Sequence, residues 1–199
     1  PSAGTLTLTV SGTMDLVQLE TGTVATSPII TAGATVTRGA DNLSIATSAF
    51  PFNAAAVTMF VEASTPVAST ATDRAFLQLD SGATNNNRLI QYVAGSSNIL
   101  NFFVSSGGAA QASVNSGATI TANTPHKLAS SAAANDFRSS VSGVLGTPDT
   151  SGSMPVGITT LRLGRDASGG QPYGHIRKVM VLPRTSTNAV CAVTGALAE

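Results

Sequence analysis

The feature that most constrains the fold of this chain is a period of two in its apolar residues. Val57, Met59 and Val61 alternate with other residues in one short run, and successive side chains of a strand point to opposite faces of a sheet. From Leu43 onward, runs of this kind recur about every ten to fifteen residues, separated by Gly, Ser and Asn. Short strands at that spacing are typical of an antiparallel β-sandwich.

The runs that we predict to be strands of the main domain are 57–63, 75–80, 89–93, 99–104, 112–114, 127–130, 137–145, 161–163 and 175–182. The polar bridge 95–98 joins two of them and is typical of a β-hairpin. Pro183 ends the last strand, because proline cannot donate to a strand ladder. Ser186 can cap a helix, and the apolar stripe that follows it predicts a short helix over 186–197.

Two further strands are expected over 5–10 and 14–19, where apolar residues again alternate or cluster. Two strands alone are marginally stable in water, so they need a partner sheet. We therefore divide the chain into residues 1–35, which hold these strands and a linker and resemble the end of a preceding β-module, and residues 36–199, the main domain. A chain that starts inside strand-like sequence is expected to be a fragment or a processed product.

Composition excludes several classes of function. The chain has 199 residues, of which 42% are hydrophobic and 10% charged, with a formal net charge of +0. Nucleic-acid binders show a basic excess, because phosphate contacts need Lys and Arg. No segment approaches the roughly 20 apolar residues of a membrane helix, and the single cysteine, Cys191, cannot form an internal disulfide. We expect no nucleic-acid partner and no membrane insertion.

Several short sequence motifs of this chain occur in the same order in one family of proteins. They are V-Q-L-E-T-G-T-V-A-T-S-P-I-I at 17–30, V-T-R-G-A-D at 36–41, F-V-E-A at 60–63, N-T-P-H-K-L-A at 123–129, A-N-D-F at 134–137, L-R-L-G at 161–164, G-H-I-R-K-V at 174–179 and P-R at 183–184. Together they resemble the concanavalin A-like (laminin G-like) jelly-roll domains of tailed-bacteriophage tail-fibre and minor tail proteins. The resemblance covers residues 17–197. It implies an all-β fold, a two-sheet antiparallel jelly-roll sandwich with a short C-terminal helix, which binds glycans or surfaces and has no fixed catalytic set.

Two loops contain the residue types that bind sugars. Planar polar groups beside an aromatic face hold a sugar, and binding loops lie on a rigid scaffold. The candidates are Asn85, Asn86, Asn87 and Arg88 in the first loop, and Arg165, Gln171 and Tyr173 in the second. The alternative interpretation is that an Asn-rich turn is only a turn.

Catalytic and metal chemistry have weaker support. A glycosidase needs two carboxylates that flank the scissile bond, yet the chain has three glutamates, and Glu62 stands alone on its predicted strand. We expect no enzymatic activity and no cofactor. Asp80 and Asp166 are weak candidates for Ca²⁺ ligands, since calcium takes six to eight oxygens. The alternative for both is a turn-forming Asp that bonds its own backbone.

The function that we expect is non-enzymatic: a structural protein of the virion, in a tail fibre or tail tip, that attaches to glycans on the host surface. Its partners would be other virion proteins and a host glycan, and the resemblance favours a homotrimer. One alternative is a capsid or head-fibre decoration protein, on the capsid surface, that binds no sugar. A second is a secreted carbohydrate-active enzyme, which the scarcity of glutamates disfavours.

Overall fold

The computed structural model describes residues 7, 9–13, 15, 17–20, 27–37, 39–66, 72–82, 84–95, 97–172 and 174–183, without the side chains of residues 116 and 117. The chain divides into two compact units, Pro1–Gly39 and Ala40–Glu199, and each is described by itself. This division places residues 36–39 with the first unit. The assignment of residues 1–35 to a preceding β-module stays a prediction.

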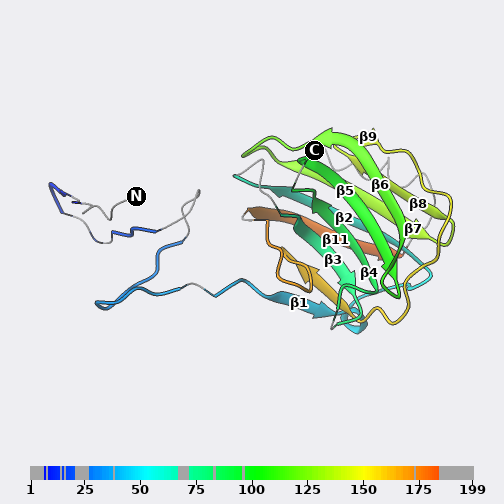
Figure 1. The fold of residues 1–199 in the computed structure, drawn as a ribbon, viewed down its shortest axis with the longest axis horizontal. Coiled ribbons are helices and arrows are strands. Elements are labelled where there is room, and N and C mark those ends of the chain that lie inside the picture. Colours follow the sequence, from blue (N-terminus) through cyan, green and yellow to red (C-terminus); the bar gives the residue numbers. More distant parts are fainter. Residues whose placement is uncertain are drawn as a thin grey trace. The chain divides into compact units, whose positions relative to one another are not determined.

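The second unit consists almost entirely of β-strands (Figure 1). The strands are β1 (Leu43–Ala46), β2 (Ala56–Ser64), β3 (Arg74–Asp80), β4 (Arg88–Val93), β5 (Ile99–Ser106), β6 (Ala109–Thr119), β7 (His126–Ala133), β8 (Asp136–Val141), β9 (Val144–Leu145), β10 (Thr160–Leu163) and β11 (His175–Pro183), with one 3-10 turn, η1 (Thr47–Ala49). Each predicted run falls on a strand, although the run 137–145 is divided between β8 and β9 and the run 112–114 is the middle of the longer β6.

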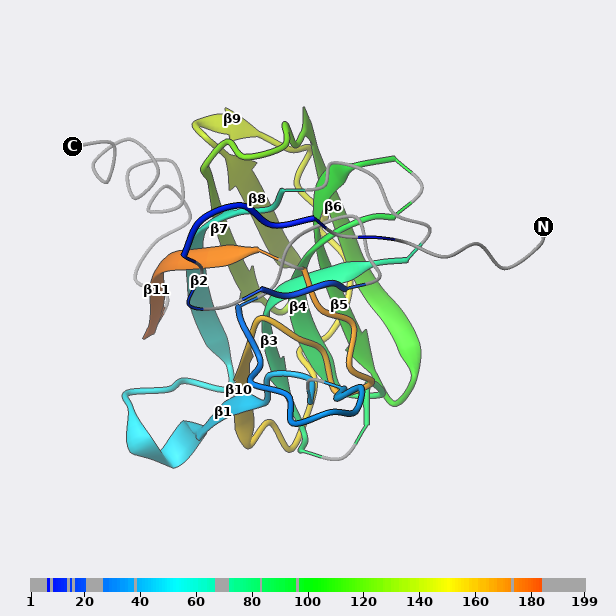
Figure 2. The ribbon, with the colours of Figure 1, turned by 90° about the vertical axis from the view of Figure 1, so that its left-hand side faces the viewer.

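The strands form two antiparallel sheets that face each other as the layers of a sandwich (Figure 2). One sheet has six strands in the order β1-β10-β3-β4-β5-β6, and the other has five in the order β11-β2-β7-β8-β9. The predicted hairpin is confirmed, since β4 pairs with β5 from Arg88↔Ser105 to Val93↔Leu100. The chain therefore has the all-β jelly-roll fold that the sequence predicts.

The core lies between the sheets and is built from the inward positions of both. On β2, Val57, Met59 and Val61 point inward, and each is at most 1% exposed. Residues from β3, β4, β5, β7 and β8 complete this cluster, with Leu77, Leu89 and Phe102 among them. Burial of apolar surface on this scale is the main favourable term in folding.

One polar group crosses the core. Gln91 points inward from β4, and its Nε2 donates to the carbonyl oxygens of Met59 (3.1 Å) and Leu128 (3.4 Å) and to Oγ of Ser130 (2.9 Å). The Ser130 hydroxyl in turn lies 3.1 Å from that of Ser139. Gln91, Ser130 and Ser139 are completely buried, so this chain of bonds ties the six-stranded sheet to the five-stranded one through the interior.

The predicted N-terminal strands are wrong for the residues that can be described. Within 7–20, the described residues take no strand conformation, and Val10, Val17 and Leu19 are 44%, 47% and 77% exposed. Alternation alone does not make a strand where no sheet offers a hydrogen-bonded neighbour and a surface to cover. A local bond is present instead: the Ile29 N–H donates to Oε1 of Gln18 at 2.6 Å. The predicted C-terminal helix over 186–197, with Cys191, lies outside the described residues.

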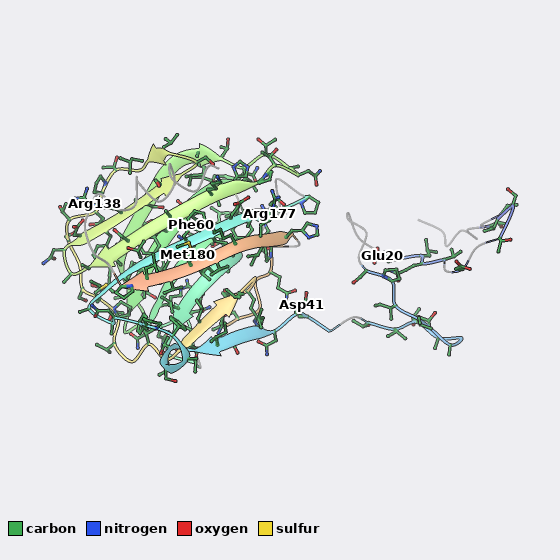
Figure 3. All side chains as sticks on the ribbon, turned by 180° about the vertical axis from the view of Figure 1, so that it is seen from behind. Glu20, Asp41, Phe60, Arg138, Arg177 and Met180 are labelled. Atoms are coloured by element: carbon green, nitrogen blue, oxygen red, sulfur yellow. The ribbon has the colours of Figure 1, made fainter. Side chains whose placement is uncertain are left out.

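The outside of the five-stranded sheet has a small apolar patch. Phe60 on β2 and Met180 on β11 are cross-strand partners there, and Ala129 on β7 pairs with Phe60 from the other side (Figure 3).

Within the described ranges, no helix has the length and apolar character that crossing a membrane requires.

Candidate functional site

A cavity of about 350 Å³ opens on the outside of the six-stranded sheet. Strands β3, β4 and β5 form its floor, and the loops 81–87 and 164–170 bring further side chains to it. The lining residues are Asp73, Ala75, Asn85, Arg88, Ile90, Tyr92, Phe103 and Asp166. It therefore combines carboxylates, an amide, a guanidinium and two aromatic rings in one place.

Strand β4 shows why the floor has this composition. Leu89, Gln91 and Val93 point into the core and are completely buried, so the period of two turns Arg88, Ile90 and Tyr92 outward. On the neighbouring strands, Phe103 is the cross-strand partner of Ile90 and Ala75 is that of Tyr92. A register shift between Ala75 and Leu77 keeps the small Ala75 on the outer face, and this leaves room beside the tyrosine ring.

Asn85 connects the two loops that border the cavity. Its Nδ2 donates to Oγ of Ser168 at 2.7 Å and to Oδ2 of Asp166 at 3.4 Å, and its Oδ1 accepts from Nε2 of Gln78 at 3.0 Å. Its carbonyl oxygen also accepts from the Ser105 hydroxyl at 3.0 Å. All these contacts orient the amide, so Asn85 holds a fixed position at the edge of the cavity.

Asp166 organises the second loop from inside. Its Oδ1 accepts the backbone N–H groups of Ser168 and Gly170, both at 2.8 Å, which closes a tight turn of the kind that Asp favours. A Cβ at Gly170 would crowd the carbonyl oxygen of Asp73 at 3.1 Å, so glycine suits this close approach. The remaining oxygen, Oδ2, faces the cavity, where it meets Asn85 and Arg88.

Arg88 lies between a carboxylate and an aromatic ring. Its Nη1 is 3.9 Å from Oδ2 of Asp166, and its guanidinium carbon lies 5.5 Å from the centre of the Phe103 ring. Stacking of this kind suits the planar guanidinium. The Nε atom of Arg88 is buried without a hydrogen-bond partner, so the fork has donor capacity that the protein itself does not use.

A buried ion pair extends the polar face beyond the cavity. Asp80 on β3 and Arg162 on β10 are joined by Nε–Oδ2 and Nη2–Oδ1 contacts of 2.7 and 3.4 Å. Arg162 also donates to the carbonyl oxygen of Gly82 at 2.7 Å, and Gln78 donates to Asp80 at 2.9 Å. Because Gln78 also bonds Asn85, one continuous network runs from the ion pair to the cavity.

Tyr92 brings a hydroxyl group and a ring to the site. Burial raises the pKa of its phenol, and the nearby Asp73 carboxylate raises that pKa further, while Arg88 acts in the opposite direction. The phenol therefore stays protonated at neutral pH and can both donate and accept a hydrogen bond. Asp73 is itself positioned by the Gly95 N–H, which donates to its Oδ1 at 3.1 Å.

The sugar-binding residues predicted from the sequence have different locations. Asn85 and Arg88 line the cavity, and Asp166, predicted as a metal candidate, lies beside them. Asn86 and Asn87 face the β5–β6 turn instead: Oδ1 of Asn87 accepts from the Gly107 N–H at 2.7 Å, and the carbonyl of Asn86 accepts from the Gly108 N–H at 2.9 Å. These two act as turn residues.

The remaining candidates lie away from the cavity lining. Nε of Arg165 donates to the carbonyl oxygen of Asp166 at 3.0 Å, and Nε2 of Gln171 donates to that of Asp41 at 2.8 Å. Neither residue is among those that line the cavity. Tyr173 lies outside the described residues.

Among the charged and aromatic residues that line the cavity, Asp73, Tyr92 and Phe103 were not candidates from the sequence. Tyr92 and Phe103 stand in apolar runs, where an aromatic residue is normally assigned to the core. The sequence does contain a signal for these two residues. Leu89 and Phe102 point into the core, and alternation along each strand then turns Tyr92 and Phe103 to the outer face. Asp73 has no such signal, because it precedes its strand.

The two predicted calcium candidates are engaged by protein donors. Asp80 accepts from Gln78, the Gly82 N–H (2.7 Å) and Arg162, and Asp166 accepts from two backbone N–H groups. A calcium ion at Asp80 would compete with these donors, and one at Asp166 would have to use Oδ2, which faces Asn85 and Arg88. Among the described residues, no group of three or more His, Cys, Asp or Glu side chains could hold a metal ion. Calcium binding stays a prediction that rests on single carboxylates.

Comparison with known proteins finds similarity at the level of the fold. No protein-family model and no curated protein sequence matches the chain. Among solved structures, it is similar to the CBM40 module of the Ruminococcus gnavus IT-sialidase bound to α2,3-sialyllactose, with a TM-score of 0.55, 15% identity and coverage of 70% of this chain and 83% of that one.

Two further neighbours come from other kinds of protein. Mouse laminin α1 domains LG4-5 give a TM-score of 0.56 at 13% identity, covering 73% of this chain and 40% of that one. Domain 4 of AbnA, an extracellular arabinanase from Geobacillus stearothermophilus, in complex with arabinotriose, gives 0.56 at 11% identity, covering 70% and 66%. At these identities the similarity establishes the fold alone, a two-sheet antiparallel jelly roll.

Proposed function

We propose that this chain is a non-enzymatic glycan-binding module, and that it serves as the host-surface attachment part of a tailed-bacteriophage tail fibre or tail tip. The observation that carries the glycan part is the cavity on the outside of the six-stranded sheet. It offers the guanidinium of Arg88, the amide of Asn85 and the hydroxyl of Tyr92 within one concave surface. Convergent polar groups beside aromatic rings on a rigid sheet are what a sugar requires.

The neighbours support this proposal through their own ligands. The R. gnavus module is bound to a sialylated lactose and the AbnA domain to arabinotriose, so sandwiches of this architecture hold sugars in more than one protein. The phage part of the proposal rests on the sequence resemblance over residues 17–197. It includes a place in the virion, other virion proteins as partners and a homotrimeric assembly.

The absence of catalysis is also part of the proposal. Two carboxylates, Asp73 and Asp166, line the cavity, and a glycosidase would use such a pair as acid and nucleophile or base. Asp166, however, is occupied by the N–H groups of Ser168 and Gly170 and faces Arg88. It has the surroundings of a group that positions its loop. A reducing-sugar assay on a mixed polysaccharide panel is expected to show no release of product above a buffer blank.

The glycan proposal is tested with an array of oligosaccharides followed by titration calorimetry of the best-bound sugar. Arg88→Ala and Tyr92→Ala are each expected to weaken binding at least about tenfold, since each removes a contact group from the centre of the site. Arg138→Ala is the matched control, because Arg138 lies on the other sheet, in β8 (Figure 3). Thermal unfolding of each variant confirms that the sandwich is intact.

Two results would overturn the proposal. If no sugar on the array binds, the chain is better described as a capsid or head-fibre decoration protein without sugar binding. If sugars bind but the Arg88 and Tyr92 variants bind as tightly as the unaltered chain, the site lies elsewhere. The trimer is tested separately by analytical ultracentrifugation, in which a monomer at high concentration would refute it.

A further inference from the structure

The charges that line the cavity are unequal. Among its lining residues, Asp73 and Asp166 are acidic and Arg88 is the single basic one. A ligand that enters the cavity therefore meets an excess of negative charge within a partly desolvated space, where charges interact more strongly than in water. This imbalance bears on which sugars can bind.

The charge of Arg88 is already compensated by the protein. Its Nη1 lies 3.9 Å from Oδ2 of Asp166, and its guanidinium covers the Phe103 ring. A carboxylate or sulfate group that approached Arg88 would also approach Asp166, and like charges at that range repel. The Nη donors of Arg88 can still bond a hydroxyl oxygen, which brings no charge with it.

Asp73 adds to the same negative field beside Tyr92. Its Oδ1 accepts from the Gly95 N–H at 3.1 Å, and its charge acts on the Tyr92 hydroxyl strongly enough to raise the phenol pKa beyond the effect of burial. An anionic group beside Tyr92 would experience this same field. A sugar hydroxyl at that position would instead donate to or accept from the phenol.

Nearby cations do not reverse the balance. Arg162 is matched by Asp80 in a buried pair, and Arg165 is not among the lining residues and donates to the Asp166 backbone. Both lysines of the chain lie on the other sheet, where Lys127 and Lys178 flank Glu62 on β7, β11 and β2. Among the described residues, the two lysines therefore add no positive charge to the lining of the cavity.

We infer that the cavity takes neutral, hydroxyl-rich sugars and rejects glycans whose contacting unit carries a carboxylate, sulfate or phosphate. The inference rests on the proposed glycan-binding function and narrows it to one chemical class. It sets this chain apart from the R. gnavus module, whose ligand is sialylated lactose. The inference follows from the charges of the lining: two carboxylates face the cavity, and the single guanidinium is already paired with one of them.

The experiment compares matched sugars on the intact chain. The strongest neutral oligosaccharide from a glycan array is titrated beside its own sialylated, sulfated or uronic-acid derivative, at low and at physiological salt. The neutral sugar is expected to bind at least about tenfold more tightly, with the larger difference at low salt, because salt screens the repulsion. Asp73→Asn should reduce the difference in affinity between the neutral and the acidic sugar. The amide oxygen of Asn can still accept the Gly95 N–H, while the negative charge is lost.

Asp136→Asn is the matched control, since Asp136 lies on β8 of the other sheet, and it should leave the difference unchanged. If the acidic derivative binds equally or more tightly and Arg88→Ala abolishes that binding, the inference is overturned while the glycan-binding function stands. If neither the neutral nor the acidic sugars bind, both the inference and the proposed function are overturned.

Discussion

Asn85 and Asp166, 81 positions apart in the sequence, are joined by a hydrogen bond of 3.4 Å from Nδ2 to Oδ2. Through this contact, and through the 2.7 Å bond from Asn85 to Ser168, the loop before β4 is attached to the loop after β10. The cavity edge is therefore made by two loops that constrain each other. These contacts add to the bonds that each loop already makes, those of Asp166 to its own turn and those of Asn85 to Gln78 and Ser105.

The first prediction concerns this attachment. Asp166→Ala removes the acceptor of the Ser168 and Gly170 N–H groups, and each charged bond of this kind is worth about 1.5–3 kcal/mol. We expect faster amide hydrogen exchange at Ser168 and Gly170 and weaker sugar binding, with the sandwich still folded. Asp149→Ala is the control, because Asp149 accepts the Ser151 N–H in a separate loop. Unchanged exchange at Ser168 and Gly170 would contradict the role assigned to Asp166.

The second prediction concerns the ion pair of Asp80 with Arg162. Asp80 is completely buried and Arg162 nearly so, so Arg162→Ala leaves an uncompensated charge inside the protein. The expected loss in the free energy of unfolding is about 3–5 kcal/mol, measured by urea denaturation. Arg138→Ala breaks the pair with Asp136, which is more exposed, and should cost less than about 1 kcal/mol. Equal losses in the two variants would refute this assignment.

The third prediction concerns the polar link through the core. Gln91→Leu deletes the donor to Met59, Leu128 and Ser130, and we expect a loss of about 1–3 kcal/mol in the free energy of unfolding. Ser130→Ala acts on the same network, so the double variant should lose less than the sum of the single variants by at least about 0.5 kcal/mol. Strict additivity would show that the Gln91–Ser130 bond contributes little.

The fourth prediction concerns the entry into β11. A Cβ at Gly174 would overlap the backbone carbonyl oxygen of Ser64, and that carbonyl belongs to the neighbouring strand β2, so it cannot move without disturbing the pairing. Gly174→Ala is expected to cost about 1–3 kcal/mol, as overpacking usually does. At Gly39 an added Cβ would meet nothing within 4 Å, so Gly39→Ala should leave the midpoint of urea unfolding unchanged. A Gly174 variant with an unchanged midpoint would be the contrary result.

The fifth prediction concerns pH. Burial lowers the pKa of His126 below its ordinary value of 6.5, although the hydrogen bond with the Thr121 backbone acts in the opposite direction. In the folded chain, Nε2 of His126 accepts the Thr121 N–H at 3.0 Å. Because the unfolded chain then binds the proton more readily, the stabilisation is complete above about pH 6.5 and declines as the pH falls through that value toward the folded pKa. His126→Gln should remove this part of the decline.

The measurement is the free energy of unfolding of the unaltered chain and the variant, compared between about pH 5 and pH 7.5, where histidine titrates. His175→Gln serves as the control and should keep the decline. Parallel curves for the unaltered chain and the His126 variant would show that His126 contributes nothing to the pH dependence.

The sequence by itself determined the strands of the main domain. Val57, Met59 and Val61 show the alternation that a strand with one face on the core requires. Strand β11 begins at the predicted residue, His175, and β7 begins at His126, one residue before the predicted start. The short polar bridge likewise placed the β4–β5 hairpin. Such features are local, because alternation and turn chemistry act between residues that are close in the chain.

The tertiary structure decided which residues share a site. The sequence contained Asn85, Arg88 and Asp166 as separate candidates, and the pairing of β10 with β3 is what brings their loops together. The tertiary structure also turns the polar Gln91 inward and the aromatic Tyr92 outward. This reverses what their polarity would predict, because the apolar residues on either side fix the register of β4. A contact between residues 81 positions apart depends on strand order, and one sequence alone contains no local signal for strand order.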